Sequence, residues 1–519
     1  MNWTCRIALA GLLAVMNSPT VSWAQEDPEP VVEEVTPLTD EEKVALFQPY
    51  VDAIARGQKS HAANALLPIL GETANQSAHG EAWVKLGDLL AEFDMEYSAL
   101  IAYDRAIDAD PNTGSVKVTP AIALARKLGD ERLLGPVLAA NVGLNVDKNT
   151  RSDIAYLAAR HYFQDGQEGM ALGMLRMVNN QADVFPDAQA LNGVILTTQG
   201  RFNDALAPLV TAQQMGRNNG RSKRFENVLQ LNVARSYFAA GNYLRAIEYY
   251  ANVDRESDFW PEAHFERAWA HFRQGDVKGT VAVLMSHEAP FFDDWYLPEG
   301  DLLRTYALFM LCKFPDANKS ISAFMDKYTP LKDQLVASVD SLTPQAAWDE
   351  ARAYLDGSKT QFPAKLLRKF STDERFLSAV KSVEKADDEL SRLQNVSANP
   401  FATMATARLQ ERRSELINAE GLRVFNHIRT ARDQLVEMLS NVEITKLDIM
   451  TYETRMLEKA SMTGTLDYGD RIGQLRRLRK KKGVRVWPFQ GEYWGDEMGY
   501  YQIQTRPDCP EGLQAGSNN

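Results

Sequence analysis

Two histidines with a glutamate between them come nearest to a chemical site in type and spacing. His264 and His271 lie seven positions apart, about two turns along one helix face, and Glu266 lies near them. Such a pair ligates a metal only if another helix supplies a third ligand. His271 also falls at a packing position of the repeat described below. We therefore interpret both histidines as structural and predict no metal site.

Sequence motifs for catalysis are missing as well. The chain contains no His-Glu-x-x-His, no Gly-x-Ser-x-Gly, no phosphate-cradling glycine loop and no Cys-x-x-Cys. Its formal net charge of -12 argues against nucleic acid as a partner. We predict that the protein is not an enzyme and holds no cofactor.

The C-terminal region, residues 466–519, is basic and then aromatic. Eight Lys and Arg side chains lie between Arg471 and Arg485, and they could meet anionic lipid, polysaccharide or an acidic protein face. The alternative is a solvated helix end that pairs with acids of the same chain.

Aromatic residues follow among glycines and Pro488, which predicts an irregular segment. They pack on the protein or stack on a sugar, and the candidate glycan or surface contacts are Trp487, Phe489, Tyr493 and Trp494.

Three cysteines are present, and Cys5 lies in the N-terminal leader. Cys312 and Cys509 therefore remain as a candidate disulfide. The alternative is a buried thiol at Cys312 and an exposed one at Cys509.

The elements that must position these residues are paired helices. Eight times between residues 51 and 330, a small residue is followed twelve positions later by another and sixteen positions later by a bulky one. The small residues of the first helix (helix A) are Ala53, Gly87, Ala121, Ala159, Gly193, Ala234, Ala268 and Thr305. Those of the second helix (helix B) are Ala65, Ala99, Leu133, Ala171, Ala205, Ala246, Thr280 and Ala317, so Leu133 and Thr280 mark degenerate copies. The bulky residues are Ile69, Tyr103, Val137, Leu175, Leu209, Tyr250, Leu284 and Ile321.

One copy is clearer than the others. Between residues 80 and 112 it carries Trp83, Leu86, Gly87, Leu90, Ala99, Tyr103, Ala106 and Pro111. This unit resembles the tetratricopeptide repeat family, whose period is about 34 residues. The resemblance implies a helical solenoid over residues 38–331 that binds other proteins. From the residues themselves, small side chains let two helices approach closely and Pro111 ends the second one.

A different periodicity follows a connecting helical segment at residues 332–372. Apolar residues recur every seven positions over residues 373–465, with a break at Asn399-Pro400. The seam residues are Phe376, Ala379, Val383, Ala386, Leu390 and Leu393 before the break. After it they are Val424, Ile428, Ala431, Leu435, Met438, Val442, Thr445, Ile449, Tyr452 and Met456. We predict a coiled-coil hairpin that projects as an arm; the alternative is a homodimer through the longer helix.

The N-terminus indicates export. Arg6 precedes an apolar run over residues 7–16, and Ser22-Trp23-Ala24 fits a signal peptidase site, so residues 1–24 are expected to be a signal peptide. Residues 25–37 read as a disordered leader. No other stretch reaches the roughly 20 apolar residues that a membrane span needs. We predict a periplasmic address, or another exported one, and no transmembrane segment in the mature chain.

The function we expect is partner capture by a scaffold. Polar side chains beside the packing positions of helix A would face a bound peptide; they are Asn192, Gln230, Asn232, Arg235, Glu266 and Arg267. Residues 266–270, 291–299 and the aromatic ending resemble exported tetratricopeptide proteins of predatory and gliding bacteria. That resemblance implies a scaffold in an envelope assembly, such as the machinery of adventurous gliding motility or of secretion, with envelope proteins as partners. The alternative function is binding of envelope polysaccharide or peptidoglycan through the aromatic tail.

Overall fold

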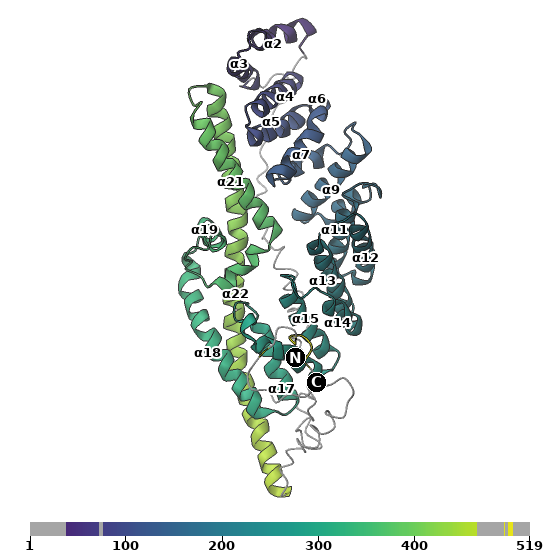
Figure 1. Cartoon of the computed structure of the whole chain (residues 1–519), viewed down its shortest axis with the longest axis vertical. Helices are drawn as coiled ribbons and strands as arrows, with labels where there is room; N and C mark the ends of the chain where they lie inside the picture. The colour runs from purple at the N-terminus through teal and green to yellow at the C-terminus, as the bar shows by residue number, and fades with distance from the viewer. Residues whose placement is uncertain (1–37, 72–75, 464–492, 494–496, 502–519) are drawn as a thin grey trace, which may run out of the picture. The chain divides into compact units, whose positions relative to one another are not determined.

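The computed structural model describes residues 38–71, 76–463, 493 and 497–501. Every regular element in this part of the chain is a helix (Figure 1). The prediction of an all-α, tetratricopeptide-like fold is confirmed. Two compact units share the chain. One, the early-repeat unit, comprises Arg6–Thr198 and Asp373–Leu422, and the other, the late-repeat unit, includes Gln199–Thr372 and Arg423–Asn519.

The early-repeat unit begins with successive helix pairs. They are α2 (Asp40–Ala55) with α3 (Lys59–Gly71), α4 (Gln76–Glu92) with α5 (Glu96–Ala109), α7 (Val118–Leu128) followed by α8 (Gly135–Ala140), and α9 (Lys148–Gln164) with α10 (Glu168–Leu175); α11 (Phe185–Thr198) follows. The short α6 (Pro111–Gly114) and η1 (Ser115–Lys117) connect α5 to α7. Pro111 lies just after the end of α5 and starts α6, as its missing N–H favours.

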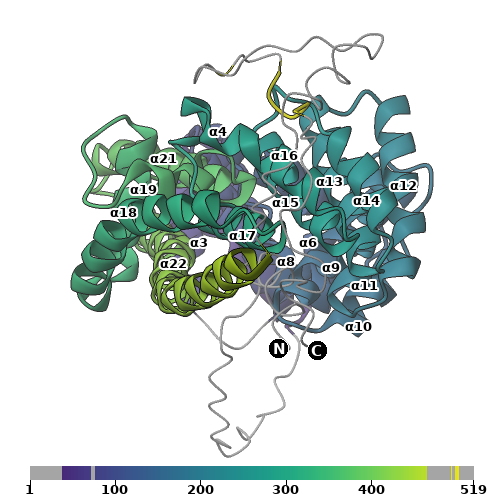
Figure 2. The same ribbon diagram turned by 90° about the horizontal axis from the view of Figure 1, so that it is seen from below.

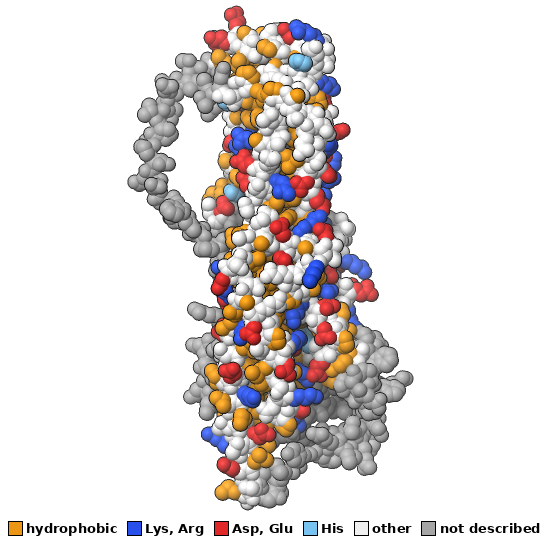
Figure 3. All heavy atoms as spheres, turned by 90° about the vertical axis from the view of Figure 1, so that its left-hand side faces the viewer, with side chains coloured by type: hydrophobic (Ala, Val, Ile, Leu, Met, Phe, Trp, Pro, Cys, Tyr) orange, Lys and Arg blue, Asp and Glu red, His pale blue; other side chains and the backbone are white. Residues whose placement is uncertain are grey.

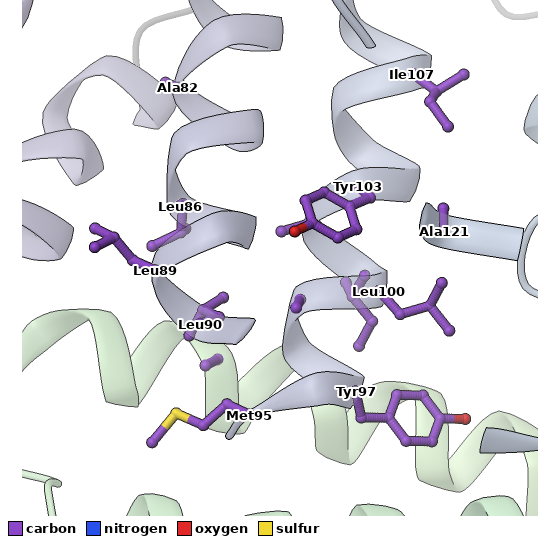
Figure 4. Close-up of a cluster of buried hydrophobic side chains, with 14 of the residues drawn as sticks. Ala82, Leu86, Leu89, Leu90, Met95, Tyr97, Leu100, Tyr103, Ile107 and Ala121 are labelled. Atoms are coloured by element: carbon purple, nitrogen blue, oxygen red, sulfur yellow. The ribbon is translucent and has the colours of Figure 1, made fainter. Parts of the chain in front are cut away.

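Close packing of α4 on α5 shows why the repeat needs its small residues. A Cβ atom added at Gly87 would lie 2.5 Å from the Tyr103 ring, so only glycine allows this approach. Leu86, Leu90, Leu100 and Tyr103 interdigitate around the contact (Figure 4). All eight bulky signature residues are at most 6% exposed.

The third repeat departs from the predicted pattern. Leu133 was expected inside helix B, but it lies in the turn before α8, which begins only at Gly135 with Pro136 in its first turn. Helix α7 ends earlier at Gly129, whose φ of +87° suits glycine. Helix B of this repeat is therefore shortened to a few residues.

Helices α21 (Glu374–Gln394) and α22 (Pro400–Thr463) begin with a hairpin in the early-repeat unit. Arg413 pairs with Asp387 at 2.6 Å, and Arg375 pairs with Glu420 at 2.8 Å. The earlier residue of α21 thus pairs with the later residue of α22, so the two helices are antiparallel. Their apolar residues join the core of the repeats: Ala386, Leu393, Phe401 and Leu409 share one cluster with Leu100. The heptad residues Ala386 and Leu393 are therefore buried with the repeats, rather than in an arm that projects from them.

The late-repeat unit contains the remaining pairs. They are α12 (Phe202–Asn218), then α13 (Lys223–Ala239) with α14 (Tyr243–Ala251), α15 (Trp260–Arg273) with α16 (Val277–Met285), and α17 (Pro298–Met310) with α18 (Phe314–Ser338). Short helices link these pairs and continue the chain: η2 (Ser286–Glu288), η3 (Pro290–Phe292), η4 (Val339–Ser341), α19 (Pro344–Leu355), α20 (Ala364–Leu367) and η5 (Arg368–Ser371). Helix α18 thus continues beyond residue 331, where we placed the end of the repeats.

The part of α22 from Arg423 onward lies beside α17 and α18 (Figures 1 and 2). Its heptad residues Ile428, Leu435, Val442 and Ile449 are fully buried within this unit. The Tyr452 ring stands edge-on to Phe309 at 5.3 Å, and the Thr445 hydroxyl contacts the Tyr306 hydroxyl at 3.3 Å. These seam positions are filled by the chain's own helices, and no helix pair with a second chain is needed to bury them.

The surface carries mixed charges. On the face in Figure 3, acidic and basic side chains are interspersed among apolar ones, so the net charge of -12 is not gathered into one patch there. Among the described helices, none combines the length and apolarity that crossing a membrane requires.

Candidate partner-binding site

The polar residues singled out in the sequence lie mainly on α13 and α15, the A helices of the sixth and seventh repeats. Ser222 caps α13 by accepting the N–H of Phe225 at 3.2 Å. Ala234 and Ala268 are fully buried, and they fix which face of each helix packs inward. Arg235 directly follows Ala234, and Glu266 and Arg267 directly precede Ala268, so these polar residues are held at the margin of the core.

Arg235 is the centre of a charged cluster. Its guanidinium forms three hydrogen bonds with Glu266, at 2.6, 2.9 and 3.0 Å, and a further ion pair with Glu262 at 2.8 Å. The side chains of Arg235 and Glu266 are 18% and 21% exposed, whereas Glu262 is 49% exposed. The cluster joins two successive A helices and presents one carboxylate, that of Glu262, to solvent.

Burial and charge set the protonation of this cluster. Burial alone would lower the pKa of Arg235, but the carboxylates of Glu266 and Glu262 outweigh it and raise that pKa. Burial raises the pKa of Glu266, and the negative charge of Glu262 adds to this rise. Glu299 shows the same effect, because burial and the nearby Glu266 raise its pKa to about 7. Arg235 therefore stays charged and serves as the fixed point of the cluster.

Arg267 contacts the C-terminal region of the chain. Its Nη2 donates to the carbonyl oxygen of Gly499 at 2.6 Å. Burial lowers the pKa of Arg267 to about 10. The residue predicted to hold a partner peptide thus holds a peptide carbonyl of its own chain.

The remaining predicted contacts are distributed differently. Gln230 is 7% exposed and accepts from the Gln213 amide at 2.7 Å while donating to the carbonyl of Tyr249 at 3.1 Å, so its polar groups are used between α12, α13 and α14. Asn232 is half-buried on α13. Asn192 is half-buried on α11 and belongs to the early-repeat unit, whereas the other predicted contacts belong to the late-repeat unit.

Much of the tail falls outside the described residues. Trp487, Phe489, Trp494, Cys509 and the basic segment from Arg471 to Arg485 belong to this part. Tyr493 is described: its hydroxyl donates to Glu288 at 2.9 Å, and its ring packs on the apolar cluster around Trp260. Cys312 is 3% exposed and disulfide-bonded, but Cys5 and Cys509 both lie outside the described residues, so its pairing with Cys509 stays a prediction.

The histidine pair has contacts of its own. His264 is 2% exposed, stacks on Trp260 at 4.9 Å and forms a hydrogen bond with the carbonyl of Val283 at 2.9 Å. His271 bonds Asp276 at 2.9 Å. Within the described ranges, no group of three His, Cys, Asp or Glu side chains is arranged to hold a metal ion.

Two contributors were not predicted from the sequence. Glu262 lies one turn before Glu266, and this spacing of two acids opposite Arg235 was the available indication. Ser286, in η2, accepts a hydrogen bond from the N–H of Gly499 at 2.9 Å. The repeat pattern in the sequence gives no indication of this contact.

The successive helix pairs define an all-α repeat protein. No protein-family model and no curated protein matches the sequence. Similar solved structures include a tetratricopeptide repeat protein from Parabacteroides merdae (14% identity, 52% of this chain and 99% of that one, TM-score 0.25). Others are a Rap protein complexed with competence and sporulation factor (14%, 73% and 99%, TM-score 0.23) and the anaphase-promoting complex hetero-tetramer Cut9-Hcn1 (14%, 78% and 86%, TM-score 0.19). Because these TM-scores are low, the repeat assignment rests on the helix pairs of this chain and not on the similar structures.

Proposed function

We propose that the protein is a non-catalytic scaffold that binds partner proteins through the A helices of its sixth and seventh repeats. The observation that carries the proposal is the cluster of Arg235, Glu262 and Glu266, which joins α13 to α15 and leaves a carboxylate exposed. A charge held in place by partly exposed ion pairs loses little side-chain freedom when a partner binds it. A basic or hydrogen-bond-donating segment is the complementary partner.

The proposed setting is the bacterial cell envelope. Its support is the N-terminal sequence, where Arg6, an apolar run and Ser22-Trp23-Ala24 have the order of a secretory signal. The partners would then be envelope proteins, in an assembly of the gliding-motility or secretion kind.

The test compares two surface glutamates on neighbouring helices. Glu262→Lys reverses the exposed charge of the cluster, and Glu248→Lys makes the same change on α14, where Glu248 is 58% exposed. In affinity capture from solubilised envelopes, we expect Glu262→Lys to reduce partner recovery by about tenfold or more, the effect of losing a well-formed charged contact. Glu248→Lys should leave recovery unchanged. Equal recovery with both variants would overturn the proposal.

A further inference from the structure

A short piece of the C-terminal region lies against the seventh repeat. Tyr493 and Met498 pack on the apolar cluster that contains Trp260 and Phe292. Gly499 sits between the A helix of this repeat, α15, and the short helix η2. The segment 497–501 thus contacts the same helix that carries Glu262, Glu266 and Arg267.

Both backbone groups of Gly499 are bound. Its N–H donates to Ser286 Oγ at 2.9 Å, and its carbonyl accepts from Arg267 Nη2 at 2.6 Å. Hydrogen bonds to the main chain hold a peptide whatever its side chains are, and pockets for neighbouring side chains then supply selectivity. Ser286 and Arg267 form such a main-chain clamp.

The clamp accepts glycine alone without strain. Gly499 has a φ of +88°, and an added Cβ atom would lie 3.3 Å from Trp260 Cζ2 and 3.5 Å from His264 Cε1. The neighbouring Tyr500 has its ring 5.3 Å from the guanidinium of Arg255, which also lies 5.6 Å from the Trp260 ring. The site therefore favours glycine at position 499, and Arg255 offers a cation to an aromatic ring at the next position.

The site has more hydrogen-bonding capacity than the segment uses. His264 Nδ1 and Arg267 Nε are buried, and neither has a hydrogen-bond partner among the described residues. Because His264 Nε2 bonds a carbonyl and so carries the proton, Nδ1 is an acceptor, whereas Arg267 Nε–H is a donor. A peptide with a further N–H and carbonyl at these atoms would satisfy both, and buried polar atoms gain most from such pairing.

We propose that residues 497–501 are an internal ligand, which occupies a glycine-selective peptide site on the seventh repeat until a partner segment with glycine before an aromatic residue displaces it. The proposal rests on the proposed function, because it takes the A helices to be the partner-binding side. It adds the class of ligand and a competition between the tail and the partner.

The test uses the full-length protein and a fluorescein-labelled peptide of residues 495–503. Gly499→Ala in the protein should loosen the internal ligand, since a left-handed backbone is unfavourable for alanine, and labelled peptide should then bind about tenfold more tightly than to the wild type. A peptide with alanine at the position of Gly499 should bind neither protein. Gly173→Ala, a site with nothing within 4 Å of the added atom, controls for folding and should bind like the wild type.

Two outcomes would overturn the inference: equal binding of the labelled peptide to the wild type and to Gly499→Ala, or equal binding of the glycine and alanine peptides. The result is separable from the proposed function. If Glu262→Lys abolishes partner capture while the peptides fail to discriminate, the scaffold proposal stands and only the internal ligand is lost. If the protein distinguishes the glycine peptide from the alanine peptide while Glu262→Lys leaves partner capture unchanged, the internal-ligand inference stands and the scaffold proposal is lost.

Discussion

At the scale of single residues, two fully buried carboxylates in the described part of the chain are each paired with an arginine. Asp130 and Glu420, whose side chains are fully buried, each meet an arginine: Arg412 at 2.7 Å and Arg132 at 2.6 Å. Asp104, on α5, differs because its Oδ1 is buried and has no hydrogen-bond partner among the described residues. Burial, together with Asp108 and Asp130, raises the pKa of Asp104 to about 7. An ionised Asp104 therefore costs stability.

This predicts a pH-dependent effect of Asp104→Asn. With a folded pKa of about 7 against an ordinary 3.8, the folded state binds the proton more strongly, so stability is lost as pH rises through that window. At pH 8 we expect Asp104→Asn to raise the free energy of unfolding by about 1–3 kcal/mol, and the gain should shrink toward pH 4. Urea unfolding at both pH values measures it. The control Asp388→Asn removes an exposed carboxylate of α21 and should change the free energy of unfolding by less than about 0.5 kcal/mol. A pH-independent effect of Asp104→Asn would contradict the assignment.

The sequence predicts the positions of single side chains well where apolar packing determines them, and poorly where polar contacts determine them. Gly87 is predicted to let two helices approach closely, and in the structure a Cβ atom added there would lie 2.5 Å from the Tyr103 ring. Gln230, by contrast, was expected to face a partner, yet it is 7% exposed. A polar residue beside a packing position faces outward or inward depending on hydrogen-bond partners on other helices, here α12 and α14, and the repeat pattern carries no such information.

At the scale of elements, α21 caps a repeat helix from outside the repeat. The side chain of Glu389 accepts the N–H groups of Tyr97 and Ser98, both at 2.8 Å, in the first turn of α5. Met95, the residue that precedes α5, provides no side-chain acceptor. Glu389 thus satisfies orphan donors of a helix N-terminus and neutralises its positive end.

Removing this cap should loosen α5 and the hairpin together. Glu389→Ala leaves two buried N–H groups unsatisfied, so we expect the free energy of unfolding to fall by about 3 kcal/mol. Glu411→Ala is a matched control on α22, since Glu411 is 57% exposed and its ion pair with Arg408 should contribute less than about 0.5 kcal/mol. Chemical denaturation of both variants decides the matter. Similar losses would mean that Glu389 does not act as a cap.

The heptad pattern predicts the helices themselves but not the helices that pack against them. A break at Asn399-Pro400 and a long second helix were expected, and α22 begins at Pro400 and runs to Thr463. The sequence could not say what buries the seam, because a seven-residue apolar repeat fits any helical neighbour. In the structure, the neighbours of the later seam include α17 and α18.

At the scale of the whole molecule, repeats and C-terminal helices share their cores within each compact unit. Ala386 and Leu409 belong to the core of the early repeats, and Tyr452 meets Phe309 in the late ones. The stretches of α21 and α22 in each unit are thus part of the repeat scaffold. Partner binding is then expected on surfaces that these helices leave exposed, of which the Glu262 side of α15 is the candidate.

The most direct test of this account is site-specific photo-crosslinking in cells. A photoreactive residue at position 262 should yield a discrete set of crosslinked envelope proteins, because that side chain borders the proposed binding face. The same residue at position 248 on α14, where the native glutamate is 58% exposed against 49% for Glu262, should yield none of them. Identical crosslinks from both positions, or crosslinks from position 248 alone, would contradict the claim that the A helices of the late repeats bind the partner.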